Sequence, residues 1–148
     1  LPAAVGATFG APERTVCMFT GDGGFQMNIQ ELGTIMENQC PVKVILMNNN
    51  YLGNVRQWQD MFFGQRKSFT RMLNPHYQLI ADAYHIPYEV VIDRKDLKAA
   101  IEKMLATDGP FILECAVKEE DNVAPMIAPG ASIDEMMLEI NIETKLDC

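Results

Sequence analysis

Two groups of residues in this chain carry side chains suited to a divalent cation. One is Asp22 within the glycine-rich run 21–24, and the other is the asparagine run 48–50. Each group follows a short apolar segment of the kind that forms a buried strand. Carboxylate and amide oxygens are the hard ligands that Mg²⁺ takes, and Mg²⁺ usually completes its shell with phosphate oxygens and water. The two groups together predict a cation site that can also hold a diphosphate.

The simpler interpretation of these residues is a pair of turns. A Gly-Asp-Gly sequence alone is more often a hairpin turn, and asparagines after a strand usually cap the next segment. Between the two groups, however, apolar residues from Phe25 to Met36 recur at three- or four-residue steps, which predicts a helix from Phe25 onward. A strand–helix–strand unit places both groups at the carboxyl ends of parallel strands, where open sheets bind ligands. The glycines there let the backbone approach an anion closely.

Two common phosphate-binding motifs are missing from the chain. No Gly-x-x-x-x-Gly-Lys-Ser/Thr sequence occurs, and Gln26 stands where a dinucleotide fingerprint needs its third glycine. Any phosphate contact at 21–24 must therefore belong to another class of site.

Strands alternate with helices along the chain, which predicts an α/β fold. We expect a three-layer sandwich whose mainly parallel sheet is flanked by helices. The predicted strands are 14–20, 41–47, 88–92 and 111–117, and helices are expected at 1–7, from Phe25, within 55–63, from Asn74-Pro75 and over 97–105. Residues 131–148 are expected to form a covering helix or a flexible tail.

Composition narrows the class of protein. The 148 residues are 48% hydrophobic and 22% charged, as in one ordinary domain, and the net charge of −8 disfavours binding to nucleic acid. No apolar run reaches the length of a membrane span, so we expect no membrane association and a cytoplasmic location. The chain opens in an apolar helical pattern without an initiator methionine, and we therefore expect a piece of a longer protein.

An aromatic segment follows the second strand. It runs from Tyr51 to Phe63 and contains Trp58, the one tryptophan of the chain. A single tryptophan most often packs in a core or an interface. Next to a charged cofactor site, the same residue could equally line an apolar pocket for a small substrate.

The two motifs resemble those of a known family. Gly21-Asp22-Gly23 followed by Asn48-Asn49 is similar to the thiamine diphosphate motif of thiamine-dependent enzymes. The runs 24–32 and 51–59 narrow the resemblance to the catalytic subunit of acetolactate synthase, also called acetohydroxyacid synthase, and it extends from Leu1 to about Asn141. It implies that residues 1–148 are the C-terminal thiamine diphosphate-binding domain of a longer enzyme.

The resemblance also implies a set of site residues. Mg²⁺ would be held by Asp22, the side chain of Asn49 and the main-chain carbonyl of Tyr51. Thiamine diphosphate would contact, besides the two metal-binding side chains, Gly21, Gly23, Gly24, Met27, Leu52 and Gly53, with Met27 nearest the thiazolium. The substrate channel would include Asn54, Val55 and Trp58.

The implied reaction decarboxylates pyruvate and joins the two-carbon unit to a second pyruvate or to 2-oxobutyrate, in branched-chain amino acid biosynthesis. The cofactor supplies the carbanion chemistry, and the protein positions and desolvates it. FAD would bind mainly outside this chain. The activating glutamate is expected in a missing N-terminal domain, so no catalytic residue is assigned here and the fragment alone should be inactive. The expected partners are the remaining domains, further copies in a dimer or tetramer, and a regulatory small subunit.

Two positions depart from the family's usual pattern. Asn54 stands where a methionine is usual, and Gly24 replaces a small hydroxyl residue. Two alternatives stay open beside the main interpretation. One is another thiamine diphosphate-dependent enzyme, of the pyruvate oxidase or glyoxylate carboligase type, and the other is a non-catalytic assembly module.

Overall fold

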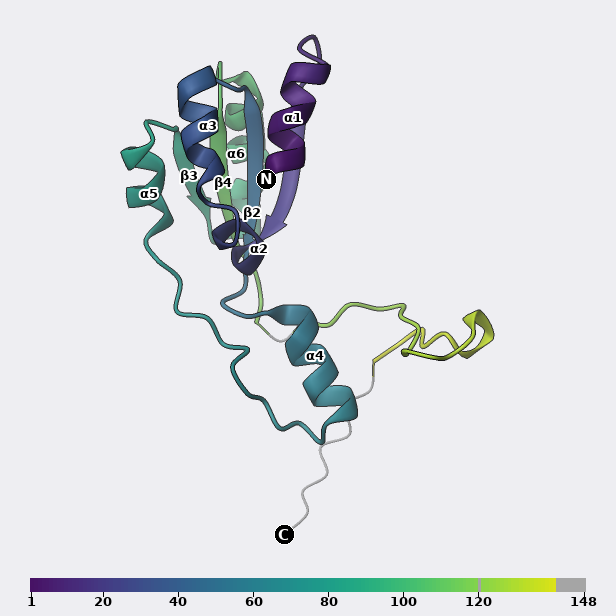
Figure 1. Ribbon diagram of the computed structural model, residues 1–148. Helices are drawn as coiled ribbons and strands as arrows, with labels where there is room; N and C mark the ends of the chain where they lie inside the picture. Colours follow the sequence, from purple (N-terminus) through teal and green to yellow (C-terminus); the bar gives the residue numbers. More distant parts are fainter. Residues whose placement is uncertain (120, 141–148) are drawn as a thin grey trace. The chain divides into compact units, whose positions relative to one another are not determined.

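The computed structural model describes residues 1–119 and 121–140, which fall into two units (Figure 1). The first unit comprises residues 1–50 and 73–117. The second comprises residues 51–72 and the described part of 118–148. No helix in the described ranges is long and apolar enough to cross a membrane.

The first unit is built on a parallel sheet of four strands in the order β1-β2-β4-β3. The strands are β1 (Val16–Gly21), β2 (Val42–Asn48), β3 (Tyr88–Val91) and β4 (Phe111–Ala116). Val16 pairs with Val42, Lys43 with Phe111, and Tyr88 with Ile112. The two central strands, β2 and β4, are covered on both faces, which explains their continuous apolar sequence. All four predicted strands are confirmed.

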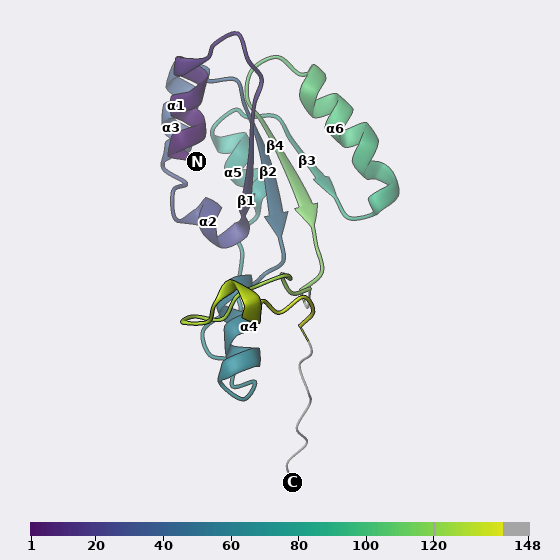
Figure 2. The same cartoon turned by 90° about the vertical axis from the view of Figure 1, so that its right-hand side faces the viewer.

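Helices cover both faces of the sheet, as Figure 2 shows. On one face lie α1 (Pro2–Gly10), α3 (Glu31–Asn38) and α5 (Tyr77–Ala83), and on the other lies α6 (Leu97–Ala106), preceded by the 3₁₀ turn η1 (Arg94–Asp96). Successive residues of β2 point to opposite faces, so Val44 packs with the first group and Ile45 packs beside α6. The three-layer α/β sandwich is confirmed.

The larger core lies between the sheet and the three helices. Leu32 and Ile35 of α3 are fully buried there, together with Phe25, whose ring meets that of Tyr77 edge-on at 5.7 Å between centroids. Each such side chain contributes about 1.5–3 kcal/mol by its removal from water. This packing holds α5 and the segment after β1 against the same face of the sheet.

The prediction of one continuous helix from Phe25 is wrong. The segment instead forms α2 (Asp22–Gln26), a turn, and then α3. In the turn the amides bond three residues back, with Asn28 N donating to Phe25 O at 3.2 Å and Glu31 N to Asn28 O at 3.1 Å. This tighter winding breaks the α-helix while Phe25 and Leu32 still face the core, so the apolar spacing did not reveal it.

The start of α5 also differs from the prediction. The helix begins at Tyr77 with His76 as its N-cap, so the expected cap, Asn74, lies outside the helix. The side chain of Asn74 instead bonds residues at the carboxyl ends of β1 and β2.

The second unit contains α4 (Gly53–Phe62), which confirms the predicted helix in the aromatic segment. Met126 and Met137 exchange two backbone hydrogen bonds, of 3.0 and 2.8 Å, and close a loop between them. Within that loop lies the 3₁₀ turn η2 (Ile133–Glu135), with Ser132 and Glu135 forming a capping box. The rest of the predicted tail, residues 141–148, lies outside the described residues.

Candidate functional site

Asp22 is a buried carboxylate at the carboxyl end of β1. It is the first residue of α2, and its side chain is only 1% exposed. Gly23 N donates to Oδ1 at 3.0 Å, and Asn74 Nδ2 donates to Oδ2 at 2.7 Å. A buried carboxylate needs such donors, since without them its transfer from water is very unfavourable. Each oxygen keeps a second lone pair available to another partner.

Asn74 connects this carboxylate with the end of the neighbouring strand. Its Nδ2 lies 2.8 Å from Asn48 Oδ1 and 3.2 Å from Asn50 Oδ1, in addition to its contact with Asp22. Its own oxygen accepts a hydrogen bond of 2.8 Å from Gln26 Nε2. Three oxygens therefore converge on one amide nitrogen at the carboxyl edge of the sheet.

A second buried carboxylate extends this network across the sheet. Glu114, on β4, is 9% exposed; its Oε1 accepts from Asn48 Nδ2 at 2.8 Å and its Oε2 accepts from the Tyr88 hydroxyl at 2.5 Å. Burial raises the pKa of Tyr88, and the hydrogen bond to Glu114 raises it further. The polar chain thus runs from Tyr88 on β3 through Glu114 and Asn48 to Asn74.

Tyr77 borders the same cluster on the side of α5. Its hydroxyl accepts a 3.2 Å hydrogen bond from Gln26 Nε2. Burial raises the pKa of Tyr77 to about 12; the hydrogen bond from Gln26 opposes this rise, and the negative charges of Asp22 and Glu114 add to it. The phenol therefore stays protonated and neutral at physiological pH.

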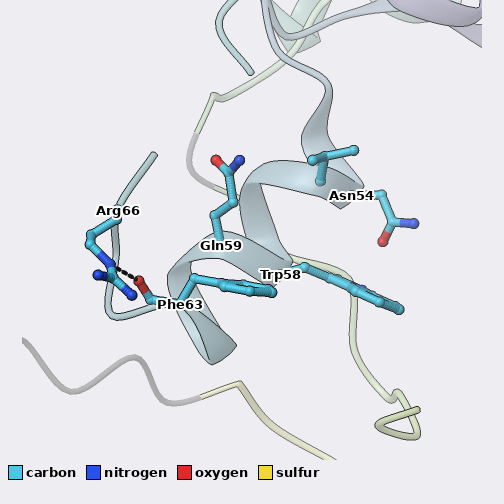
Figure 3. Close-up of a pocket in the computed structure, with 6 residues that line it drawn as sticks. Asn54, Trp58, Gln59, Phe63 and Arg66 are labelled. Carbon is cyan, nitrogen blue, oxygen red and sulfur yellow. Dashed lines mark hydrogen bonds between the residues drawn. The ribbon is translucent and has the colours of Figure 1, made fainter. Parts of the chain in front are cut away.

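The second unit has a cavity of about 600 Å³ along α4. Its lining combines two aromatic rings with amide and guanidinium groups: Asn54, Val55, Trp58, Gln59, Phe63 and Arg66. Figure 3 shows Asn54 and Trp58 projecting from the same side of the helix. The three residues predicted for a substrate channel therefore line one pocket.

The cavity wall is fixed by its own hydrogen bonds. Gln59 exchanges two bonds of 3.0 Å with the backbone of Ser68, and Arg66 Nε donates to Phe63 O at 3.0 Å, the dashed line in Figure 3. The Trp58 ring meets Phe62 edge-on at 6.0 Å. These contacts keep one face of α4 open.

The opposite face of α4 is buried against residues 121–126. Gln57 Nε2 donates to Val123 O at 2.9 Å, and Val123 N donates to Gln57 Oε1 at 2.7 Å. The buried Arg56 donates to Asn122 Oδ1 at 3.2 Å and lies 5.3 Å from the centre of the Tyr51 ring. The helix is thereby fixed in rotation, which determines the side chains that reach the cavity.

A family model described as "Thiamine pyrophosphate enzyme, C-terminal TPP binding domain" matches residues 1–115 of this chain. The chain belongs to this family. The match includes the whole sheet except the last residue of β4, and with it every residue of the polar network described above.

Similar proteins point to one branch of thiamine diphosphate enzymes. The chain is 43% identical over 142 residues to the acetolactate synthase isozyme 2 large subunit of Escherichia coli (strain K12), an alignment that covers 95% of this chain and 26% of that protein. It is 41% identical over 147 residues to the chloroplastic acetolactate synthase 2 of Nicotiana tabacum, covering 94% and 22%. The chain thus spans about a quarter of the length of the curated relatives it matches.

A solved structure supports the fold independently. The thiamine diphosphate-dependent 4-hydroxybenzoylformate decarboxylase of Rhodococcus jostii RHA1 aligns with a TM-score of 0.76 at 26% sequence identity. The alignment covers 82% of this chain and 23% of that protein. The α/β sandwich is therefore the fold of a thiamine diphosphate-binding domain.

The predicted cofactor residues are divided between the two units. In the first unit, Gly21 ends β1, Asp22 and Gly23 are buried, Gly24 is exposed within α2, Met27 is 71% exposed, and Asn49 is half-buried directly after β2. In the second unit, Leu52 is the N-cap of α4 and Gly53 its first residue, while Tyr51 makes a backbone bridge to Arg71.

The donor set of the TPP-binding domain fits a hard cation. The described residues contain no group of three or more His, Cys, Asp and Glu side chains that could hold a metal. Asp22 instead shares the donor Asn74 with the amide oxygens of Asn48 and Asn50. Mg²⁺ commonly binds through one or two carboxylates together with phosphate oxygens. The chemistry of the first unit therefore matches a magnesium diphosphate site.

The sequence analysis missed Asn74, Glu114, Tyr88 and Gln26. Asn74 precedes a proline and reads as a helix cap, which hides its contact with Asp22. Glu114 did carry a signal, because a single carboxylate inside the apolar strand 111–116 must find buried donors. Its partners, however, come from other strands and could not be named from the sequence.

Proposed function

We propose that this TPP-binding domain holds Mg²⁺ and the diphosphate of thiamine diphosphate in an enzyme that makes acetolactate. The observation that carries the proposal is the buried Asp22 carboxylate at the end of β1, which Asn74 links by hydrogen bonds to the amide run at the end of β2. The identity to acetolactate synthase large subunits supports the choice among thiamine diphosphate enzymes.

In this proposal Mg²⁺ takes Asp22, the side chain of Asn49 and the main-chain carbonyl of Tyr51 as ligands. Backbone groups of Gly23, Gly24, Leu52 and Gly53 would contact the diphosphate, and Gly21 would also belong to the cofactor site. A bound thiamine diphosphate supplies the carbanion chemistry of decarboxylation. Met27, 71% exposed after α2, would approach the thiazolium.

The cavity along α4 receives the substrate. Trp58 and Val55 form its apolar wall and exclude water, and Asn54 adds an amide where the resemblance implies a methionine. Arg66 places a positive charge at the same cavity. An apolar wall beside a cation suits small 2-oxo acids such as pyruvate and 2-oxobutyrate.

The rest of the proposed enzyme lies beyond this chain. FAD binds mainly outside it, and the glutamate that activates the cofactor comes from another domain. We place the protein in the cytoplasm, as a homodimer or homotetramer with a regulatory small subunit, within branched-chain amino acid biosynthesis.

The test uses the complete protein that carries this chain. Purified protein is supplied with pyruvate, Mg²⁺ and thiamine diphosphate, and the products are quantified for the wild type, for Asp22→Ala and for Asp82→Ala. Asp82 is an exposed carboxylate on α5 and serves as the matched control. We expect acetolactate from the wild type and from Asp82→Ala, and none from Asp22→Ala. Full activity of Asp22→Ala would refute the assignment of the metal ligand.

A second candidate is a thiamine diphosphate-dependent decarboxylase that releases an aldehyde. The aligned Rhodococcus jostii RHA1 decarboxylase favours it. The same assay separates the two, because acetaldehyde in place of acetolactate, with the same dependence on Asp22, would support the decarboxylase. Consumption of no pyruvate would support the non-catalytic assembly module.

A further inference from the structure

We infer that Asn74 is a positioning residue for the cation site, acting through Asp22 and the asparagine run rather than on the cation. The inference rests on the proposed function. Its basis is the contact of one amide nitrogen with Asp22 Oδ2 at 2.7 Å, Asn48 Oδ1 at 2.8 Å and Asn50 Oδ1 at 3.2 Å.

Asn74 leaves the carboxylate free to bind a cation. Oδ1 of Asp22 accepts one hydrogen bond from Gly23 N, and Oδ2 accepts one from Asn74. A carboxylate oxygen has two lone pairs, so each oxygen retains one for a metal. The hydrogen bonds therefore orient the carboxylate without occupying its whole coordination capacity.

Asn74 also sets the spacing between two strand ends. Asp22 follows β1, whereas Asn48 ends β2 and Asn50 lies in the loop beyond it. Proposed ligand Asn49 lies between the two asparagines that Asn74 holds. Asn74 links Asp22 to both neighbours of Asn49, and it therefore restricts the distance between the proposed ligands Asp22 and Asn49.

The amide itself is held from two sides. Gln26 Nε2 donates to its oxygen at 2.8 Å, which fixes the orientation of the carboxamide. The two N–H bonds of Asn74 then point toward three acceptors, which share them. On the other side, Asn48 is anchored by Glu114. Metal ligands supported in this way bind more tightly, and loss of the supporting group typically lowers metal affinity by about 10- to 100-fold.

The experiment measures cation affinity in the complete protein. Mg²⁺ is titrated into protein with saturating thiamine diphosphate, and binding is followed by calorimetry. The variants are Asn74→Ala, Gln26→Leu and the control Asn38→Ala, whose exposed amide donates to Thr34 O at 3.0 Å. Melting temperature without cation is recorded for each, so that loss of fold is separated from loss of the site.

We expect the Kd for Mg²⁺ to rise about 10- to 100-fold in Asn74→Ala, and by a smaller factor in Gln26→Leu. We expect no change in Asn38→Ala. If Asn74→Ala does not fold, Gln26→Leu decides the result, because it releases the carboxamide without removing it.

Two outcomes would overturn the inference and leave the proposed function standing. The first is wild-type Mg²⁺ affinity in both site variants. The second is tighter binding in Asn74→Ala, which would show that the amide competes with the cation. A wild-type protein that binds neither Mg²⁺ nor thiamine diphosphate would refute the proposed function and the inference together.

Discussion

The two ends of strand β2 both carry hydrogen-bonded polar side chains, but the partners of those side chains differ. At the amino end, Lys43 is 4% exposed and its Nζ donates to the carbonyl oxygens of Thr107, at 2.5 Å, and Gly109, at 2.6 Å. At the carboxyl end, Asn48 bonds the side chains of Glu114 and Asn74. Lys43 is satisfied by main-chain atoms of one loop, whereas Asn48 is satisfied by side chains from two other segments, Glu114 on β4 and Asn74 before α5.

This difference distinguishes the purely structural contact of Lys43 from the proposed cation site at the other end of the strand. The carbonyls around Lys43 are held in place by the backbone between α6 and β4, and burial lowers the pKa of the lysine while nearby Asp108 opposes the shift. The carboxyl end instead offers carboxylate and amide oxygens with lone pairs to spare. Burial of a polar group therefore does not by itself mark a functional site; the kind of partner does.

The largest effect that tests this comparison is expected from Lys43→Met. The change keeps the apolar stem but removes the donor from two partly buried carbonyls, which costs about 1–3 kcal/mol of stability. Calorimetry of the complete protein should show a lower melting temperature, while affinity for Mg²⁺ stays at the wild-type value. Lys98→Met, on the exposed side of α6, is the control. A changed Mg²⁺ affinity in Lys43→Met would contradict the claim that the amino end of β2 has a structural role alone.

A smaller effect is expected from Tyr88→Phe at the other end. The variant removes one hydrogen bond to Glu114, a loss of about 1 kcal/mol, and Asn48 continues to bond the carboxylate. Thermal unfolding measures the loss, with Tyr84→Phe as the matched control. Destabilisation larger than that of Lys43→Met would mean that the side-chain network carries more of the stability than the lysine contact.

The contact between Gly24 and Thr20 predicts a still smaller effect. A Cβ at position 24 would lie 3.2 Å from Thr20 Oγ1, closer than such atoms usually come. Gly24→Ala should therefore lose the gain of about 0.5–1 kcal/mol that alanine brings to a helix. In a Thr20→Ala background the same change should stabilise the protein. A double-mutant cycle on cation-free protein measures this coupling between positions 20 and 24. If the stability changes of the two substitutions are simply additive, the crowding is relieved without cost.

The last effect is a loss of stability at alkaline pH, and it is not seen at neutral pH. Folding raises the pKa of Tyr77 from 10.0 to about 12, so the folded state holds this proton more tightly than the unfolded state. The contribution to stability is complete below pH 10 and is lost as pH rises from 10 toward 12. Melting temperatures across this range should fall less steeply for Tyr77→Phe than for the wild type. Identical slopes would mean that Tyr77 ionises without cost to the fold.

Much of the first unit could be predicted because its signals are local. Mostly apolar runs such as 42–46 form strands that are buried on both faces of a parallel sheet. The burial of such a residue can therefore be predicted from its immediate neighbours in the sequence. The order of residues along the chain then places Asp22 and Asn49 just after the carboxyl ends of their strands, at one edge of a parallel sheet. The turn at 27–30 was missed because helical and tighter winding keep the same apolar residues inward.

The sequence by itself determined the strands, their parallel alternation with helices, and the placing of a carboxylate and an amide run at one edge of the sheet. The tertiary structure alone decided that Asn74 reaches Asp22 across 52 residues and that Asn48 reaches Glu114 across 66. Periodicity determines which way a side chain faces within its own strand or helix. Which distant residue meets it depends on strand order and on the packing of α5, and no spacing along the chain records either.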